Sequence, residues 1–223
     1  MFIETLNALK HVLWPTRCAA CDVLLPEPDV LLCEDCSDAV QPAADFVCPD
    51  NIERACAVFR YEGAVQQMIA KWKYHEDYGA RHALLACLPA QLERLRECIP
   101  QNACIIPVPP HPKRLRERGF DPVWQFANEL HKLLKRNDIP TDFRDDVLSR
   151  TRHTPHQASL SHDERMHNLD GAFHVADGFT ADHVVLIDDV VTTGATAATC
   201  ALALKNAGIR HISFVALAYT AKS

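Results

Sequence analysis

Two adjacent acids, Asp188 and Asp189, follow an apolar run, residues 184–187, that has the composition of a buried strand. A hydroxyl-rich loop and then a helical pattern come next. The loop residues are Val191, Thr192, Thr193, Gly194, Ala195 and Thr196. Where a strand turns into a helix, backbone N–H groups and the positive end of the helix dipole converge and favour an anion. Because two carboxylates would repel a bare phosphate, we predict a sugar phosphate, with Asp188 and Asp189 at the ribose hydroxyls and the loop at the 5′-phosphate.

Other readings of this segment are weaker. It lacks the lysine of a Walker A loop and the three glycines of a dinucleotide fingerprint, so neither nucleoside triphosphate hydrolysis nor NAD chemistry is supported. The purely structural alternative is that Thr192 or Thr193 caps the following helix while the acids only complement its dipole.

A second chemical pattern consists of two cysteine pairs near the N-terminus. Cys18-x-x-Cys21 and Cys33-x-x-Cys36 have the spacing of four thiolates around one tetrahedral zinc ion. Redox-active pairs and buried thiols are the alternatives, but this Pro-rich segment has little other core material, which favours a structural zinc ion without an open position. Cys48 and Cys56 remain ambiguous. The other four cysteines lie in apolar patterns typical of inert core, and they are Cys87, Cys98, Cys104 and Cys200.

Composition limits the class of protein. The chain has 223 residues, of which 48% are hydrophobic and 23% charged, so it can bury a sizeable core and is not globally disordered. Its ten cysteines are too few for a disulfide scaffold, and no apolar run approaches the length of a membrane span. The N-terminus has no basic region or cleavage site of a signal peptide, so we expect cytoplasmic residence and no membrane insertion. A net charge of −6 restricts any nucleic-acid site to a local patch.

The elements that position these residues alternate between strand and helix. We predict strands over 57–61, 104–107, 184–187 and 212–218, and helices over 2–14, 64–73, 80–96, 123–134 and 195–206. Residues 141–170 are polar and are expected to form a loop or arm. This alternation predicts an α/β fold with a mainly parallel, doubly wound sheet. We divide the chain into an N-terminal helix and small four-cysteine zinc module over 1–56 and a larger domain over 57–223.

The segment around Asp188 resembles the phosphoribosyl pyrophosphate (PRPP) motif of type I phosphoribosyltransferases, an apolar strand, two acids and Thr-Thr-Gly-x-Thr. Together with the cysteine module, it makes the chain similar to the ComF/GntX family of competence-associated bacterial proteins. The further stretches that carry the resemblance are Trp72-Lys73-Tyr74, Pro107-Val-Pro109, Arg114-Leu-Arg116-Glu-Arg118-Gly119-Phe120, Arg150-Thr-Arg152, Thr154-Pro-His-Gln157 and Arg165-x-x-Asn168-x-x-Gly171-Ala-Phe173. The chain departs from the pattern at Asp121-Pro122, where Asn-Gln usually follows Gly-Phe, and in having only Cys48 and Cys56 in place of further paired cysteines.

The resemblance implies PRPP and Mg²⁺ as ligands and a type I phosphoribosyltransferase-like fold with its site at the carboxyl ends of the strands. The turn after strand 104–107 would be the pyrophosphate loop. Arg118 would act with Asp188 and Asp189 in catalysis, and Lys73 and Arg114 would bind PRPP. Lys113 and Arg116 are further candidates, and a solvated helical face is the alternative for these basic residues.

Two functions follow from this resemblance. One is a Mg²⁺-dependent phosphoribosyltransferase acting on an amine or base. The other is a catalytically inactive adaptor in DNA uptake that binds single-stranded DNA or a helicase. The basic run 111–118 and the aromatic residues Phe120 and Trp124 suit the second function, although the helical pattern around Trp124 favours packing in the core.

Overall fold

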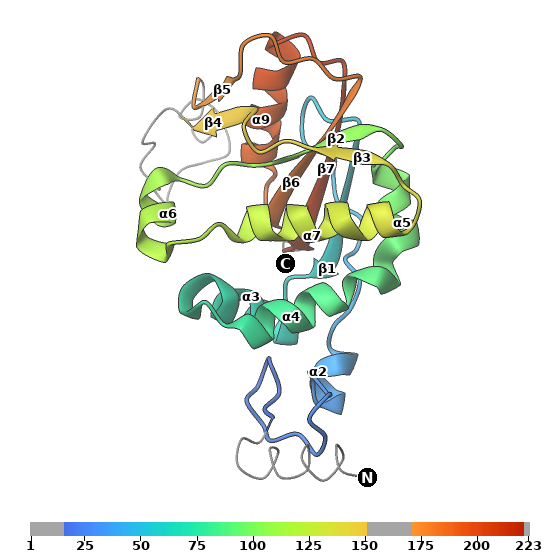
Figure 1. Cartoon of the computed structure of the whole chain (residues 1–223), viewed down its shortest axis with the longest axis vertical. Helices are drawn as coiled ribbons and strands as arrows, with labels where there is room; N and C mark the ends of the chain where they lie inside the picture. Colours follow the sequence, from blue (N-terminus) through green and yellow to red (C-terminus); the bar gives the residue numbers. More distant parts are fainter. Residues whose placement is uncertain (1–15, 151–170, 221–223) are drawn as a thin grey trace.

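A computed structural model describes residues 16–150 and 171–220 (Figure 1). The predicted helix over 2–14 and the family-like stretches from Thr154 to Asn168 lie outside the described residues. Within the described ranges, no helix has the length and hydropathy needed to cross a membrane.

A five-stranded parallel sheet forms the centre of the molecule, in the order β1-β7-β6-β2-β3. Its strands are β1 (Arg54–Arg60), β2 (Ala103–Pro107), β3 (Thr141–Phe143), β6 (His183–Val191) and β7 (His211–Tyr219). A small antiparallel pair, β4 (Leu148–Arg150) and β5 (Phe173–Val175), lies outside this sheet. The parallel order confirms the predicted doubly wound α/β class.

Helices cover both faces of the sheet (Figure 1). In chain order the helices are α2 (Glu34–Asp38), α3 (Gly63–His75), α4 (Tyr78–Ala86), the 3₁₀ turn η1 (Leu88–Gln91), α5 (Leu92–Cys98), α6 (Pro112–Arg118), α7 (Pro122–Arg136) and α9 (Ala195–Asn206), of which α2 lies away from the sheet. Alternate residues of β6 enter separate cores: Val185 and Ile187 pack with α3, α4, α5 and α7, whereas Val184 and Leu186 pack with α9. This burial on both faces explains why β6 reads as a continuous apolar run.

Three predicted elements differ from the structure. The single helix expected over 80–96 is interrupted at Pro89, which has no N–H and clashes with the preceding turn, and the 3₁₀ turn η1 separates α4 from α5 there. The described part of the expected loop 141–170 contains β3 and β4, whose three-residue lengths are too short to leave a clear period. The strand expected to end at Ile187 continues to Val191, so Asp188 and Asp189 lie within β6.

The register explains how a strand can carry these two acids. β6 pairs with β2 as far as Pro107 opposite Ile187, and beyond this point it pairs with β7 alone. The chain leaves β2 there, and the N–H of Val108 donates to the Ile187 carbonyl at 2.8 Å. Since β2 leads through α7 to β3 on one side and β6 leads through α9 to β7 on the other, the winding reverses between β2 and β6. The carboxyl ends of strands at such a reversal are the usual ligand site of open α/β sheets.

Candidate functional site

Asp189 forms an ion pair with Lys73, which lies near the end of α3. Lys73 Nζ is 2.8 Å from Asp189 Oδ2, and the two side chains are only 14% and 18% exposed. The N–H of Val190 also donates to Asp189 Oδ1 at 2.6 Å. Thus α3 brings a positive charge from a distant part of the sequence to the acids of β6.

Asp188 lies in a different environment. Its Oδ1 accepts from the backbone N–H of Asp189 at 2.8 Å, but burial, followed by the neighbouring charge of Asp189, raises its pKa to about 7. Lys73 opposes this shift without cancelling it. A carboxyl group poised near neutrality at the end of a strand has the features expected of a ligand or proton site.

A hollow of about 440 Å³ opens beside Lys73, between the end of α3 and α6. Arg114 and Arg118 line it, so the structure brings these two predicted residues together with Lys73. The ring of Tyr74 also lines the hollow, and the Arg118 guanidinium lies 5.2 Å from its centroid. Three cations and two carboxylates, those of Glu76 and Glu117, line this hollow, so its formal charge is positive by one and favours an anion.

The other two basic candidates on α6 are not part of this lining. Lys113 forms an i,i+4 ion pair with Glu117 at 3.8 Å, and Arg116 is exposed. The sequence could not separate them from Arg114 and Arg118, because a seven-residue helix with four basic residues has no clear polar face.

The loop from Val191 to Thr196 joins β6 to α9 at the same end of the sheet. Gly194 occupies the N-cap position of α9 with a left-handed φ of 75°, which favours glycine. Thr193 Oγ1 accepts only a long hydrogen bond from the N–H of Ala195, at 3.4 Å. The simple capping alternative therefore receives little support, and the position of the loop suits an anion at the start of a twelve-residue helix.

Two further residues have roles that the sequence reading missed. Asp121, noted only as a departure from the family pattern, caps α7 by accepting from the N–H groups of Val123 and Trp124 at 2.9 and 3.2 Å. An acid followed by proline at the start of an apolar helical pattern was the signal for this cap.

Arg150, at the end of β4, was noted only as part of a family-like stretch. It is partly buried, which lowers its pKa, and its guanidinium lies 5.3 Å from the centroid of the Phe173 ring. Nothing in the sequence indicated this contact, because β4 and β5 are too short to show a period.

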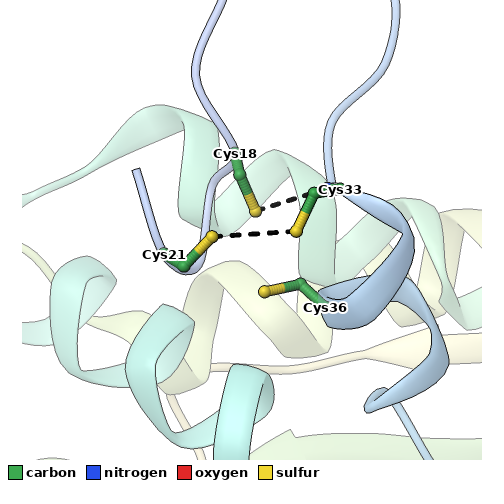
Figure 2. A group of neighbouring side chains, drawn as sticks. All are labelled: Cys18, Cys21, Cys33 and Cys36. Atoms are coloured by element: carbon green, nitrogen blue, oxygen red, sulfur yellow. Dashed lines mark hydrogen bonds between the residues drawn. The ribbon is translucent and has the colours of Figure 1, made fainter. Parts of the chain in front are cut away.

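The four N-terminal cysteines converge as their spacing predicts (Figure 2). Their sulfur atoms all lie within 4.8 Å of one another, and Cys21 Sγ is 3.7 Å from Cys33 Sγ. A tetrahedron with metal–sulfur bonds of ~2.3 Å has edges of about 3.8 Å, so four thiolates here fit one thiophilic ion. The residues come from a loop and from the start of α2, and all four point toward a common centre (Figure 2).

The electrostatics of this cluster also suit a metal. Burial raises the pKa of Cys18, but N–H groups of Cys21, Cys33 and Ala20 directed at its sulfur outweigh this effect and bring the pKa to about 6. The thiol of Cys36 has a raised pKa, first because of burial and then because of the neighbouring cysteines. Four thiolates this close together repel one another unless a cation lies between them.

Of the four cysteines predicted to be core residues, Cys98, Cys104 and Cys200 are buried, whereas Cys87 is only half-buried. Cys104 and Cys200 are buried and burial raises the pKa of each, to about 11 for Cys104. Cys56 and Cys98 are also buried, and their thiols interact with each other. Among the described residues, neither Cys48 nor Cys56 belongs to a cluster that could hold a second metal ion.

The chain matches the family described as "Phosphoribosyl transferase domain" over residues 124–223. It is 24% identical over 216 residues to Competence protein ComFC of Streptococcus pneumoniae, covering 87% of this chain and 90% of that protein. These matches support assignment of the chain to the ComF family, with a phosphoribosyl transferase domain in its C-terminal part. Within this family it is also 34% identical over 117 residues to Competence protein F of Haemophilus influenzae, covering 51% of this chain and 49% of that protein.

A further relative is the DNA utilization protein YhgH of Escherichia coli O157:H7, 36% identical over 103 residues, or 46% of this chain and 43% of that protein. The matched region thus spans about half of the Haemophilus protein and less than half of YhgH. A hypoxanthine phosphoribosyltransferase from Staphylococcus aureus has 14% identity and a TM-score of 0.35, covering 61% of this chain and 62% of that one. This structural likeness is too distant to bear on the site.

Proposed function

We propose that this protein binds PRPP or a related sugar phosphate together with Mg²⁺, and that it acts in the uptake or processing of transforming DNA. The observation that supports the binding proposal is the ion pair of Lys73 with Asp189, because it joins the acids of β6 to a residue that lines the same hollow as Arg114 and Arg118. The role in DNA uptake rests on the names of the competence and DNA utilization proteins to which the chain is similar.

Each part of the site has a role in this proposal. Asp188 and Asp189 hold the ribose hydroxyls, and the loop from Val191 to Thr196 holds the 5′-phosphate through its N–H groups. Lys73, Arg114 and Arg118 neutralise the pyrophosphate, and a Mg²⁺ ion, which prefers oxygen ligands, would supply further positive charge to the phosphate oxygens. Catalysis would require these groups to stabilise the leaving pyrophosphate more strongly as its bond to C1 lengthens.

The N-terminal cluster of Cys18, Cys21, Cys33 and Cys36 is proposed to hold a structural zinc ion. Lys71 Nζ lies 2.7 Å from Oδ1 of Asp22, next to Cys21, and this contact joins the cysteine loop to α3. We also propose the division into a module over 1–56 and a domain over 57–223, and residence in the cytoplasm.

A comparison of arginine variants on one helix tests the binding proposal. Calorimetric titration of PRPP and Mg²⁺ should show that Arg114→Gln and Arg118→Gln each weaken binding about tenfold or more, because a charge-assisted contact is lost. Arg116→Gln removes the same charge from the same helix outside the hollow and should bind like the wild type. Equal losses in all three variants would show that only general charge matters. Release of pyrophosphate in the presence of candidate amines and bases then distinguishes an enzyme from a binding protein.

Exposed aromatic side chains favour a second function, that of a catalytically inactive adaptor for single-stranded DNA or a helicase. Tyr78 and Trp124 are 71% and 38% exposed and line a hollow of about 470 Å³ between α4 and α7. Arg81 lies 4.3 Å from the centroid of the Tyr78 ring. Trp124 was expected in the core, but it lies at the surface, where its ring makes a T-shaped contact with Phe143 and its Nε1 donates to Asp145 at 2.7 Å. Exposed rings beside cations are the usual surface for unpaired bases.

Variants of the exposed rings test the adaptor function. Tyr78→Ala should weaken binding of a single-stranded oligonucleotide by about fivefold or more, since each base stacked on a ring contributes ~1–3 kcal/mol. The affinity should also fall steeply as salt is added. Unchanged affinity in Tyr78→Ala would exclude this surface, and no affinity at low salt would direct the search to a protein partner.

A further inference from the structure

A strap of chain, residues 41–52, leads from the four-cysteine cluster to β1 and passes over one face of the sheet. It begins beside β1, where Pro42 forms an antiparallel bridge with Phe59. It continues past the end of β7, where the ring of Phe46 stacks on that of Tyr219 with centroids 4.8 Å apart. The strap therefore shares the face of the sheet that α9 covers.

Pro49 of this strap lies directly against Gly194 of the loop between β6 and α9. A Cβ atom added to Gly194 would lie 2.6 Å from Pro49 Cγ, closer than real Cβ atoms approach, and 3.0 Å from Pro49 Cβ, which is a tight contact. Pro49 is buried, although its neighbours Val47 and Asp50 are exposed. Glycine is therefore needed at position 194 for two reasons: its φ is left-handed, and the ring of Pro49 leaves no room for a Cβ atom.

We propose that Pro49 is a positioning residue for the loop from Val191 to Thr196. This inference rests on the proposed sugar phosphate site. A loop that contains glycine samples many conformations, and only some of them direct its N–H groups at one phosphate. The rigid ring of Pro49, itself fixed in the strap, restricts Gly194 on one side and holds the loop ready for the ligand.

The position of Pro49 also gives the strap a role beyond connecting two parts of the chain. Phe46 fixes the strap to the end of β7, three residues before Pro49. A movement of the strap would reach the loop through the contact of Pro49 with Gly194. We therefore expect the mobility of the loop to change when Pro49 is replaced and to stay the same when an equivalent residue elsewhere on the strap is replaced.

The test uses the full-length protein with four changes: Pro49→Gly, Gly194→Ala, the two combined, and Pro42→Gly as the matched control. Pro42 is an exposed proline of the same strap, and it pairs with Phe59 of β1. Because both variants replace a proline by glycine, they increase the conformational entropy of the unfolded chain to the same extent. Amide hydrogen exchange of residues 192–196 is measured without ligand, and the affinity for PRPP with Mg²⁺ is measured by calorimetry. Pro49→Ala, which keeps Cβ, replaces Pro49→Gly if that variant does not fold.

We expect Pro49→Gly to speed amide exchange in the loop by about tenfold and to weaken PRPP binding about three- to tenfold, while Pro42→Gly matches the wild type. Gly194→Ala should weaken binding in the wild-type background more than in Pro49→Gly, because removal of the ring makes room for the new Cβ.

Two results would overturn the inference. The first is an amide exchange rate in the loop of Pro49→Gly equal to that of Pro42→Gly. The second is a loss of PRPP affinity in the combined variant equal to the product of the losses in Pro49→Gly and Gly194→Ala. If the wild type does not bind PRPP, the proposed function fails, and the exchange rates alone decide whether Pro49 holds the loop.

Discussion

Replacement of Asp188 by asparagine should stabilise the protein although it removes a residue of the proposed site. The pKa of this carboxyl is raised from 3.8 to about 7, chiefly by burial and then by the charge of Asp189. A carboxyl with a raised pKa in the folded state loses stability as pH rises, because the unfolded chain gives up its proton more readily. Its contribution to stability is fully present below about pH 4 and is lost as pH rises to about 7.

The size of this effect follows from the pKa. One pKa unit corresponds to ~1.4 kcal/mol, so the ionised carboxylate of Asp188 lowers the free energy of unfolding by at most ~4 kcal/mol above pH 7. Relaxation around the carboxylate reduces this value, and we expect Asp188→Asn to be about 2 kcal/mol more stable than the wild type at pH 8. The amide oxygen of asparagine can still accept the N–H of Asp189, which leaves the local backbone bond in place.

Denaturant unfolding between pH 4 and 8, in buffer without added Mg²⁺, measures this difference. The difference in free energy of unfolding between Asp188→Asn and the wild type should grow from about pH 4 to about pH 7 and level off above it. Asp189→Asn is the matched control: it leaves the charge of Lys73 without its partner and should destabilise the protein by about 1–3 kcal/mol at pH 8. An Asp188→Asn variant that is less stable than the wild type at pH 8, or a gap that does not change with pH, would refute this reasoning.

Three further changes have defined outcomes. Lys73→Met should weaken PRPP binding about tenfold in calorimetry, because a cation is lost from the hollow and Asp189 is left unpaired; wild-type affinity would contradict this. Cys36→Ser should abolish stoichiometric zinc, measured by elemental analysis, and lower the melting temperature, whereas retention of one zinc per chain would exclude a four-cysteine site. Trp72→Phe removes the bond from Nε1 to Gln125 Oε1 at 2.9 Å and should lower the free energy of unfolding by ~1–2 kcal/mol in urea; an unchanged value would show that this bond adds nothing.

The sequence predicts most of the central sheet, because its strands are buried on both faces. The apolar run of β6 and the helix over 195–206 were both expected, and the helix has the predicted bounds. The end of β6 was not predicted, since Asp188 and Asp189 interrupt the apolar run while β7 continues to pair with the strand. The spacing of apolar residues indicates which positions are buried, but it does not indicate where the backbone of a strand stops pairing with its neighbour.

The convergence of the cysteines also follows from spacing, because two CxxC pairs allow only a few compact arrangements. By contrast, the contact of Lys73 with Asp189 joins residues more than a hundred positions apart, and only the resemblance to a family indicated Lys73. Pro49 was not indicated at all, since its role depends on where the strap passes over Gly194. The exposure of Trp124 was missed because Asp145 and Phe143, which hold its ring at the surface, come from another part of the chain.

The most direct test of the account is calorimetric titration of PRPP with Mg²⁺ into the wild type and into the combined Asp188→Asn, Asp189→Asn variant. We predict saturable binding of one PRPP per chain to the wild type and none to the folded variant. Absence of binding by a folded, zinc-loaded wild type would contradict the account and would leave the phosphoribosyl transferase domain as a scaffold for DNA or protein partners.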